Sequence, residues 1–117
     1  YMNNSIELNR YNSRAYFKRA LIYYAKRQYL AGLQDMKRAI KLEKIPTFTL
    51  WLAKIYFKIR QYKNALNEIN KFLTKLPWNH QAKVLKAKIL KSLGKRKVAE
   101  QIFQQAALIK KMDRKIR

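Results

Sequence analysis

Groups able to catalyse a reaction are scarce in this sequence of 117 residues. It holds no cysteine, one histidine (His80) and six Asp and Glu residues, and no two carboxylates are spaced to share a proton or to bind a metal ion. The two glycines, Gly32 and Gly94, stand far apart and form no phosphate-binding loop. We expect the His80 side chain to be exposed at the start of a helix. The sequence therefore predicts a protein that is not an enzyme and that uses no metal ion or cofactor.

Aromatic and basic residues that suit binding recur at helical spacing. Trp51, Lys54 and Lys58 follow one another by three and four residues, so they share one face of a helix. A second trio shares a face in the same way: Phe17, Leu21 and Tyr24. Such faces suit a partner segment with apolar anchors and nearby Asp or Glu. The alternative is burial between neighbouring helices, since aromatic residues at this spacing usually belong to a core.

Charge is the unusual part of the composition. Lys and Arg number 28 against six Asp and Glu, a formal net charge of +22 at pH 7. A field of this size attracts nucleic acid, anionic membranes and acidic protein surfaces, at first without specificity. No run reaches the roughly 18 apolar residues of a membrane span. The lack of cysteine is typical of an intracellular, reducing compartment.

A repeat positions these side chains. Small residues recur at Ala20, Ala53 and Ala87, at intervals of 33 and 34 residues. Three more sets keep the same phase: Tyr23, Tyr56 and Leu90; Gly32, Ala65 and Ala99; Met36, Ile69 and Phe103. A period near 34 indicates a repeat array, in which stacking of units supplies the core. The small residues allow helices to approach closely, and we favour this reason over a helix break for Gly32.

Each unit divides into two amphipathic helices. Asn12-Ser13 and Asn79 are predicted caps, Pro46 is suited to a first helical turn, and Gly94 marks a connecting turn. The predicted helices cover 14–27, 29–43, 46–59, 62–75, 80–93 and a last segment from about 97 towards the C-terminus.

The repeat resembles the tetratricopeptide repeat family. In the first unit the resemblance lies in these residues: Ala20, Tyr23, Tyr29, Gly32, Met36 and Ala39. Pro77 closes the second unit as it does in the family. The resemblance implies an all-α fold, a right-handed superhelical array of antiparallel helix pairs. It makes the whole chain a single array fragment: the tail of a preceding repeat at 1–11, repeats at 13–45, 46–79 and 80–111, and a basic tail at 112–117.

Some residues depart from the family pattern. Arg19, Lys83 and Lys86 stand where bulky apolar residues are usual, and Phe72 replaces a small one. The third unit is therefore expected to pack less well, with lysine stems beside apolar neighbours. Several apolar residues near the end have no following unit in this sequence, so a cap, another repeat or a partner is expected there: Ile102, Leu108, Ile109, Met112 and Ile116.

The resemblance also implies a concave groove lined by the first helix of each unit. Carried onto this chain, its residues are Phe17, Leu21, Tyr24, Leu50, Trp51, Lys54, Phe57, Lys58, Val84, Lys88 and Lys91. Burial between helices stays open for Phe17, Leu50 and Phe57. One subclass of the family binds the C-terminal carboxylate of heat-shock chaperones through a Lys/Asn/Arg clamp. That activity is not expected here, because other residues occupy the clamp positions: Phe17, Leu21, Trp51, Gln81 and Leu85.

Two kinds of function follow. The first is a non-enzymatic scaffold in a multiprotein complex, whose groove binds an acidic or amphipathic segment of a partner protein. The alternative is a basic, RNA-associated subunit of a ribonucleoprotein, or a docking module on an acidic filament or membrane surface. It rests on lysines of the outer helices (Lys37, Arg38, Lys41, Lys63, Lys71, Lys97) and on a basic surface near the C-terminus (Lys110, Lys111, Arg114, Lys115, Arg117).

Overall fold

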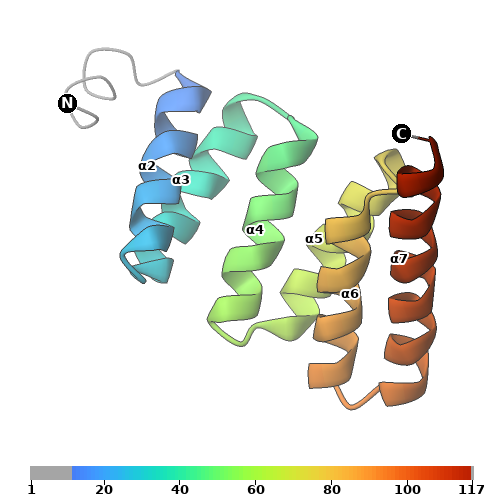
Figure 1. The fold of residues 1–117 in the computed structure, drawn as a ribbon. Coiled ribbons are helices and arrows are strands. Elements are labelled where there is room, and N and C mark those ends of the chain that lie inside the picture. The colour runs from blue at the N-terminus through green and yellow to red at the C-terminus, as the bar shows by residue number, and fades with distance from the viewer. Residues whose placement is uncertain (1–11, 117) are drawn as a thin grey trace.

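Six helices follow one another in a computed structural model of the chain, which describes residues 12–116 (Figure 1). Their bounds are α2 Ser13–Ala25, α3 Tyr29–Leu42, α4 Pro46–Lys58, α5 Tyr62–Lys75, α6 His80–Ser92 and α7 Arg96–Ile116. No strand occurs in this range. The pairs α2–α3, α4–α5 and α6–α7 form antiparallel hairpins that stack side by side. The predicted all-α solenoid of helix pairs is confirmed.

Polar caps and proline start the first helix of each repeat. The side chain of Asn12 accepts a hydrogen bond from the backbone N–H of Ala15 at 3.2 Å, and Asn79 accepts one from Ala82 at 2.9 Å. Each bond satisfies one of the N–H groups that a helix start leaves without a partner. Pro46 is the first residue of α4, where its missing N–H costs nothing. The helix starts expected from these residues are confirmed.

The turn inside each repeat has the same backbone geometry in all three units. Arg27, Arg60 and Gly94 adopt positive φ angles of 62°, 63° and 84°. In each case the next residue's N–H bonds back to the first helix, as in Gln61 to the Tyr56 carbonyl at 2.9 Å. Such left-handed residues end a helix by satisfying its last carbonyls. The first helix of repeat one therefore ends at Ala25, two residues before the predicted end at Arg27.

Small residues bring the paired helices together. Gly32 lies inside α3, and a Cβ there would stand 3.2 Å from the Ala20 carbonyl oxygen and 3.8 Å from Ile55 Cδ1. Ala20 and Ala53 are fully buried. Close approach of backbones, and not a helix break, is the reason for Gly32.

The core consists of two clusters. The larger runs without interruption from α2 into α6, and the smaller joins α6 to α7 through Ala87, Leu90, Ala99 and Ile102. Lys86 of α6 is partly buried, and burial, followed by repulsion from Lys83, lowers its pKa. Poorer packing of the third repeat stays a prediction, since Ala82, Leu85 and Ile89 of α6 belong to the larger cluster.

Helix α7 leaves part of its apolar surface uncovered. Ile102 and Ile109 are buried, whereas Leu108 and Met112 are 59% and 55% exposed. The helix continues through 112–116, so this part of the expected basic tail is helical. The expected tail of a preceding repeat, residues 1–11, lies outside the described residues, as does Arg117.

Candidate functional site

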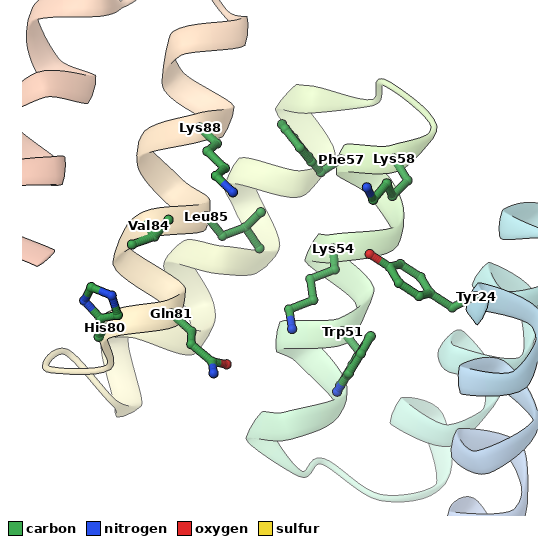
Figure 2. Close-up of a pocket in the computed structure, with 10 residues that line it drawn as sticks. All are labelled: Tyr24, Trp51, Lys54, Phe57, Lys58, His80, Gln81, Val84, Leu85 and Lys88. Carbon is green, nitrogen blue, oxygen red and sulfur yellow. The ribbon is translucent and has the colours of Figure 1, made fainter. Parts of the chain in front are cut away.

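A groove of about 380 Å³ opens on the side formed by α2, α4 and α6 (Figure 2). Its lining residues are Tyr24, Trp51, Lys54, Phe57, Lys58, His80, Gln81, Val84, Leu85 and Lys88. They come from the first helices of three successive repeats. The groove therefore exists only because the repeats stack.

Helical periodicity separates the groove face of α4 from its core face. Trp51, Lys54 and Lys58 lie on the groove side, while Leu52 and Ile55 are buried. A helix repeats every 3.6 residues, so residues three, four and seven apart lie on one side. In α6 the same spacing brings Gln81, Val84, Leu85 and Lys88 to the groove.

Aromatic rings form the α2–α4 side of the groove. The rings of Tyr24 and Trp51 meet edge to face with centroids 5.2 Å apart, and Tyr24 also meets Tyr29 at 5.4 Å. Edge-to-face contact is a favourable arrangement of aromatic quadrupoles. Burial, and then the neighbouring Tyr29, raise the pKa of Tyr24, so its hydroxyl stays protonated and can donate a hydrogen bond.

The charged residues that line the groove are all basic. Lys54 Nζ lies 4.1 Å from the centroid of the Trp51 ring, a close cation–π contact. Lys54 is half-buried, and that burial lowers its pKa. Among the described residues, no carboxylate pairs with Lys54, and no Asp or Glu lines the groove. Lys58 and Lys88 are exposed, so the groove concentrates uncompensated positive charge beside an apolar wall.

The His80 side chain is less exposed than the sequence predicted. Its ring is partly buried, and Nδ1 lies 2.8 Å from the backbone carbonyl oxygen of Ala106 in α7. Since a carbonyl only accepts, Nδ1 carries a proton and donates it, which ties the start of α6 to α7. The sequence-based expectation of a fully exposed side chain was wrong, because the sequence does not reveal that α7 passes beside this position.

Seven of the eleven predicted groove residues line the observed groove: Tyr24, Trp51, Lys54, Phe57, Lys58, Val84 and Lys88. Their part in binding a partner stays a prediction. Three further residues line it that the sequence analysis did not assign to it: His80, Gln81 and Leu85. Gln81 and Leu85 stand at clamp positions of a related groove and three or four residues from Val84 and Lys88, and this spacing was the available signal.

The other four predicted residues lie elsewhere. Leu50 is only 7% exposed, belongs to the core and is not among the residues that line the groove, as the burial alternative left open for it describes. Phe17 is partly buried and packs on Phe48 with ring centroids 4.7 Å apart. Leu21 is partly buried outside the groove lining, and Lys91 is exposed beyond it, in a depression shared with α7.

The basic residues of the outer helices are mostly free of acidic neighbours. Lys37, Lys41, Lys63 and Lys97 are exposed, whereas Arg38 contacts Asp35 at 3.1 Å and Lys71 pairs with Glu68 at 3.2 Å. Of the predicted C-terminal basic surface, Lys110 and Lys111 are exposed on α7. The side chains of the remaining members, Arg114, Lys115 and Arg117, lie outside the described residues.

Over residues 12–116 no three His, Cys, Asp or Glu side chains gather as metal ligands would. In the same part of the chain, no helix has the length and apolar character needed to cross a membrane.

Family models match both parts of the array. The model described as "Psidin, N-terminal TPR repeats region" matches residues 52–116, and the one described as "Tetratricopeptide repeat" matches residues 13–45. The chain belongs to the tetratricopeptide repeat family. Arrays of this family are protein–protein interaction scaffolds, and this is the general class of the chain.

Solved structures share the fold at low sequence identity. A structure titled "Crystal structure of MamA" superposes with a TM-score of 0.90 at 17% identity, over 97% of this chain and 67% of that one. "Crystal structure of MamA protein" gives 0.87 at 17% identity over 97% and 63%, and "MamA MSR-1 C2" gives 0.86 at 13% over 96% and 65%. The chain spans about two thirds of their length. No curated protein matches it.

Proposed function

We propose that this chain is a non-enzymatic scaffold whose groove binds an acidic or amphipathic segment of a partner protein within a multiprotein complex. One observation carries the proposal: Lys54, Lys58 and Lys88 line the groove beside aromatic and aliphatic walls, and no carboxylate of the described residues lines it. Positive potential in a concave surface attracts acidic partners and speeds their encounter. Apolar walls then provide affinity through buried area.

The groove has the composition of a binding hot spot. Trp51 is partly exposed and held by Tyr24 and Lys54, so a partner can cover the ring without a large rearrangement. Preformed aromatic side chains lose little conformational entropy on binding. Val84 and Leu85 offer aliphatic contact on the α6 side. This arrangement supports one apolar anchor of a partner segment between α4 and α6, with acidic residues close to it.

The test is capture of protein partners by wild type and by a groove variant that combines Trp51→Ala, Lys54→Glu and Lys88→Glu. Extracts are treated with nuclease first, so that RNA cannot bridge. The matched control carries Trp78→Ala, Lys41→Glu and Lys97→Glu, which make the same changes of charge and residue type at exposed positions outside the groove. Circular dichroism verifies that both variants keep their helix content. We expect loss of capture only in the groove variant, and equal capture by all three proteins would remove the groove from the proposal.

The second candidate is an RNA-associated function, favoured by the net charge of +22 and the exposed lysines of the outer helices. It requires the logarithm of affinity for RNA to fall linearly with the logarithm of salt concentration, as counterions are released. Partners that disappear after nuclease treatment would favour it over the groove. The same measurements with anionic vesicles or acidic filaments test the docking alternative.

A further inference from the structure

In the free protein, the Lys54 ammonium covers one face of the Trp51 indole in the groove. The ammonium lies 4.1 Å from the indole centroid, and Figure 2 shows the two side chains next to each other on α4. A half-buried ammonium with no anionic partner among the described residues has lost part of its hydration. The cation–π contact compensates for part of that loss.

A carboxylate would be a better partner for Lys54 than the indole is. Cation–π contacts at partly exposed sites are weak, whereas charge-assisted hydrogen bonds are about twice as strong as neutral ones. A carboxylate that enters beside Lys54 would therefore draw the ammonium away from the ring. The face of Trp51 that Lys54 covers would then become available to an apolar side chain.

We propose that Lys54 and Trp51 form a two-part subsite that recognises a carboxylate with an adjacent apolar or aromatic side chain in the partner segment. This inference rests on the proposed function of the groove and specifies what its occupant must contain. Lys54 moves from the indole to the carboxylate, and the apolar side chain takes the place that it leaves on Trp51. Either feature alone is bound weakly, because the other half of the subsite remains unsatisfied.

The lining favours a carboxylate over a phosphate group. Within the described part of the chain no arginine lines the groove, although arginine is the residue best suited to bidentate contact with phosphate. The start of α6, beside His80 and Gln81, is already capped by the Asn79 side chain, so its N–H at Ala82 is not free for an anion. One half-buried ammonium matches the single charge of an Asp or Glu side chain.

Three fluorescein-labelled peptides in one Gly-Ser frame test the subsite by fluorescence anisotropy at 0.15 M salt. The first contains Asp-Phe, the second Asn-Phe and the third Asp-Ser, so that charge and apolar anchor are removed one at a time. We expect wild type to bind the Asp-Phe peptide about tenfold more tightly than either of the others. One charged hydrogen bond gives this ratio over the Asn-Phe peptide, and burial of the phenyl ring gives it over the Asp-Ser peptide. Equal binding of the three peptides by wild type would overturn the inference.

Variants then assign the effect to Lys54. Lys54→Gln should bind the Asp-Phe and Asn-Phe peptides equally. Lys97→Gln, which removes the same charge from an exposed position on α7, should keep the tenfold ratio. A ratio that survives in Lys54→Gln, or is lost in Lys97→Gln, contradicts the role of Lys54. An oligouridine that binds as tightly as the Asp-Phe peptide, with the same dependence on Lys54, would replace the carboxylate by phosphate and also overturn the inference.

Movement of Lys54 has its own readout. The chain has two tryptophans, so Trp78→Phe leaves Trp51 as the only one. Its emission should shift to shorter wavelength when the Asp-Phe peptide binds and covers the indole, and to longer wavelength with the Asp-Ser peptide, which draws Lys54 away and leaves the indole exposed to water. Failure of the groove variant to lose partner capture would contradict the proposed function itself. A different result would contradict only the two-part subsite: the groove variant loses partner capture, but Lys54→Gln keeps the wild-type ratio of affinities for the Asp-Phe and Asn-Phe peptides.

Discussion

Asp35 of α3 accepts hydrogen bonds from both Nε and Nη2 of Arg19 across the interface with α2. The carboxylate is only 1% exposed, and Arg38 one turn further along α3 adds a contact of 3.1 Å. The hydrogen bond to Asp35 raises the pKa of Arg19. Arg19 stands where the family usually has a bulky apolar residue, and its charge is accommodated by this buried partner.

Replacing Asp35 should lower the free energy of unfolding substantially. Asp35→Asn leaves Arg19 without its buried countercharge, and loss of one partner of a buried ion pair typically costs 3–5 kcal/mol. Because the two arginine side chains are 19% and 56% exposed, we expect a value near the lower limit, about 2–3 kcal/mol. Urea unfolding followed by circular dichroism measures it.

The control for Asp35 is the exposed pair of Glu68 and Lys71. Glu68→Gln should change the free energy of unfolding by less than about 0.5 kcal/mol, as surface pairs do. Similar losses in the two variants would mean that the Arg19–Asp35 contact is no more than a surface ion pair.

Replacing the turn residue Arg27 or Arg60 by glycine should raise the free energy of unfolding. Both hold a positive φ that an L side chain adopts at a cost of about 1 kcal/mol, and glycine adopts it freely. Arg60→Gly should therefore stabilise the array by about 0.5–1 kcal/mol in urea unfolding. Lys63→Gly, at an exposed helical position three residues later, should destabilise it by a similar amount. A loss of stability in Arg60→Gly would show that the arginine side chain makes a compensating contact.

Of the three left-handed turn residues, the sequence predicts only one. The repeat phase of Ala20, Ala53 and Ala87 was enough to predict six helices and most of their bounds, because spacing directly reflects stacking. Gly94 identified one left-handed turn. The residue type does not predict a left-handed turn at Arg27 or Arg60, since arginine has no preference for positive φ. Only their equivalence to Gly94 in the repeat indicates such a turn.

The groove could be predicted in part for a similar reason. Successive helical residues differ by about 100° in direction, so neighbours such as Leu50 and Trp51 separate into core and groove. The family resemblance implied both for the groove, whereas in the structure Trp51 lines the groove and Leu50 is buried in the core. The burial of Asp35 in α3 could not be predicted from the sequence, because it depends on which side chain of α2 contacts its carboxylate.

The hydrogen bond from His80 to Ala106 should hold α7 against α6. His80→Ala removes a donor from a partly buried carbonyl, at a cost of about 1 kcal/mol. Because the smaller core cluster joins these helices, hydrogen exchange should become faster in α7 and stay unchanged in α2 and α3. Gln81→Ala, at an exposed neighbour with no such bond among the described contacts, is the control. Uniform acceleration along the array would indicate global unfolding instead of local opening.

Binding of a carboxylate in the groove should depend on pH through Lys54. Burial holds the pKa of Lys54 below its ordinary value of 10.5, so in the free protein this ammonium loses its proton before exposed lysines do. A carboxylate favours the charged form, and binding is therefore coupled to proton uptake as the pH rises through the lowered pKa. The preference for the Asp-Phe over the Asn-Phe peptide should decline in that window.

The groups that face Lys54 allow this titration to be isolated. Tyr24 of α2 has a raised pKa and stays neutral there, while Lys58 on α4 and His80 and Lys88 on α6 are the other titratable groups of the groove. Lys54→Arg keeps its charge at every accessible pH, so its peptide preference should stay constant where that of wild type declines. Anisotropy titrations of both proteins from pH 7 upwards measure the difference. Parallel curves for wild type and Lys54→Arg would assign the decline to Lys58, Lys88 or the remaining surface charge, because only Lys54 differs between the two proteins.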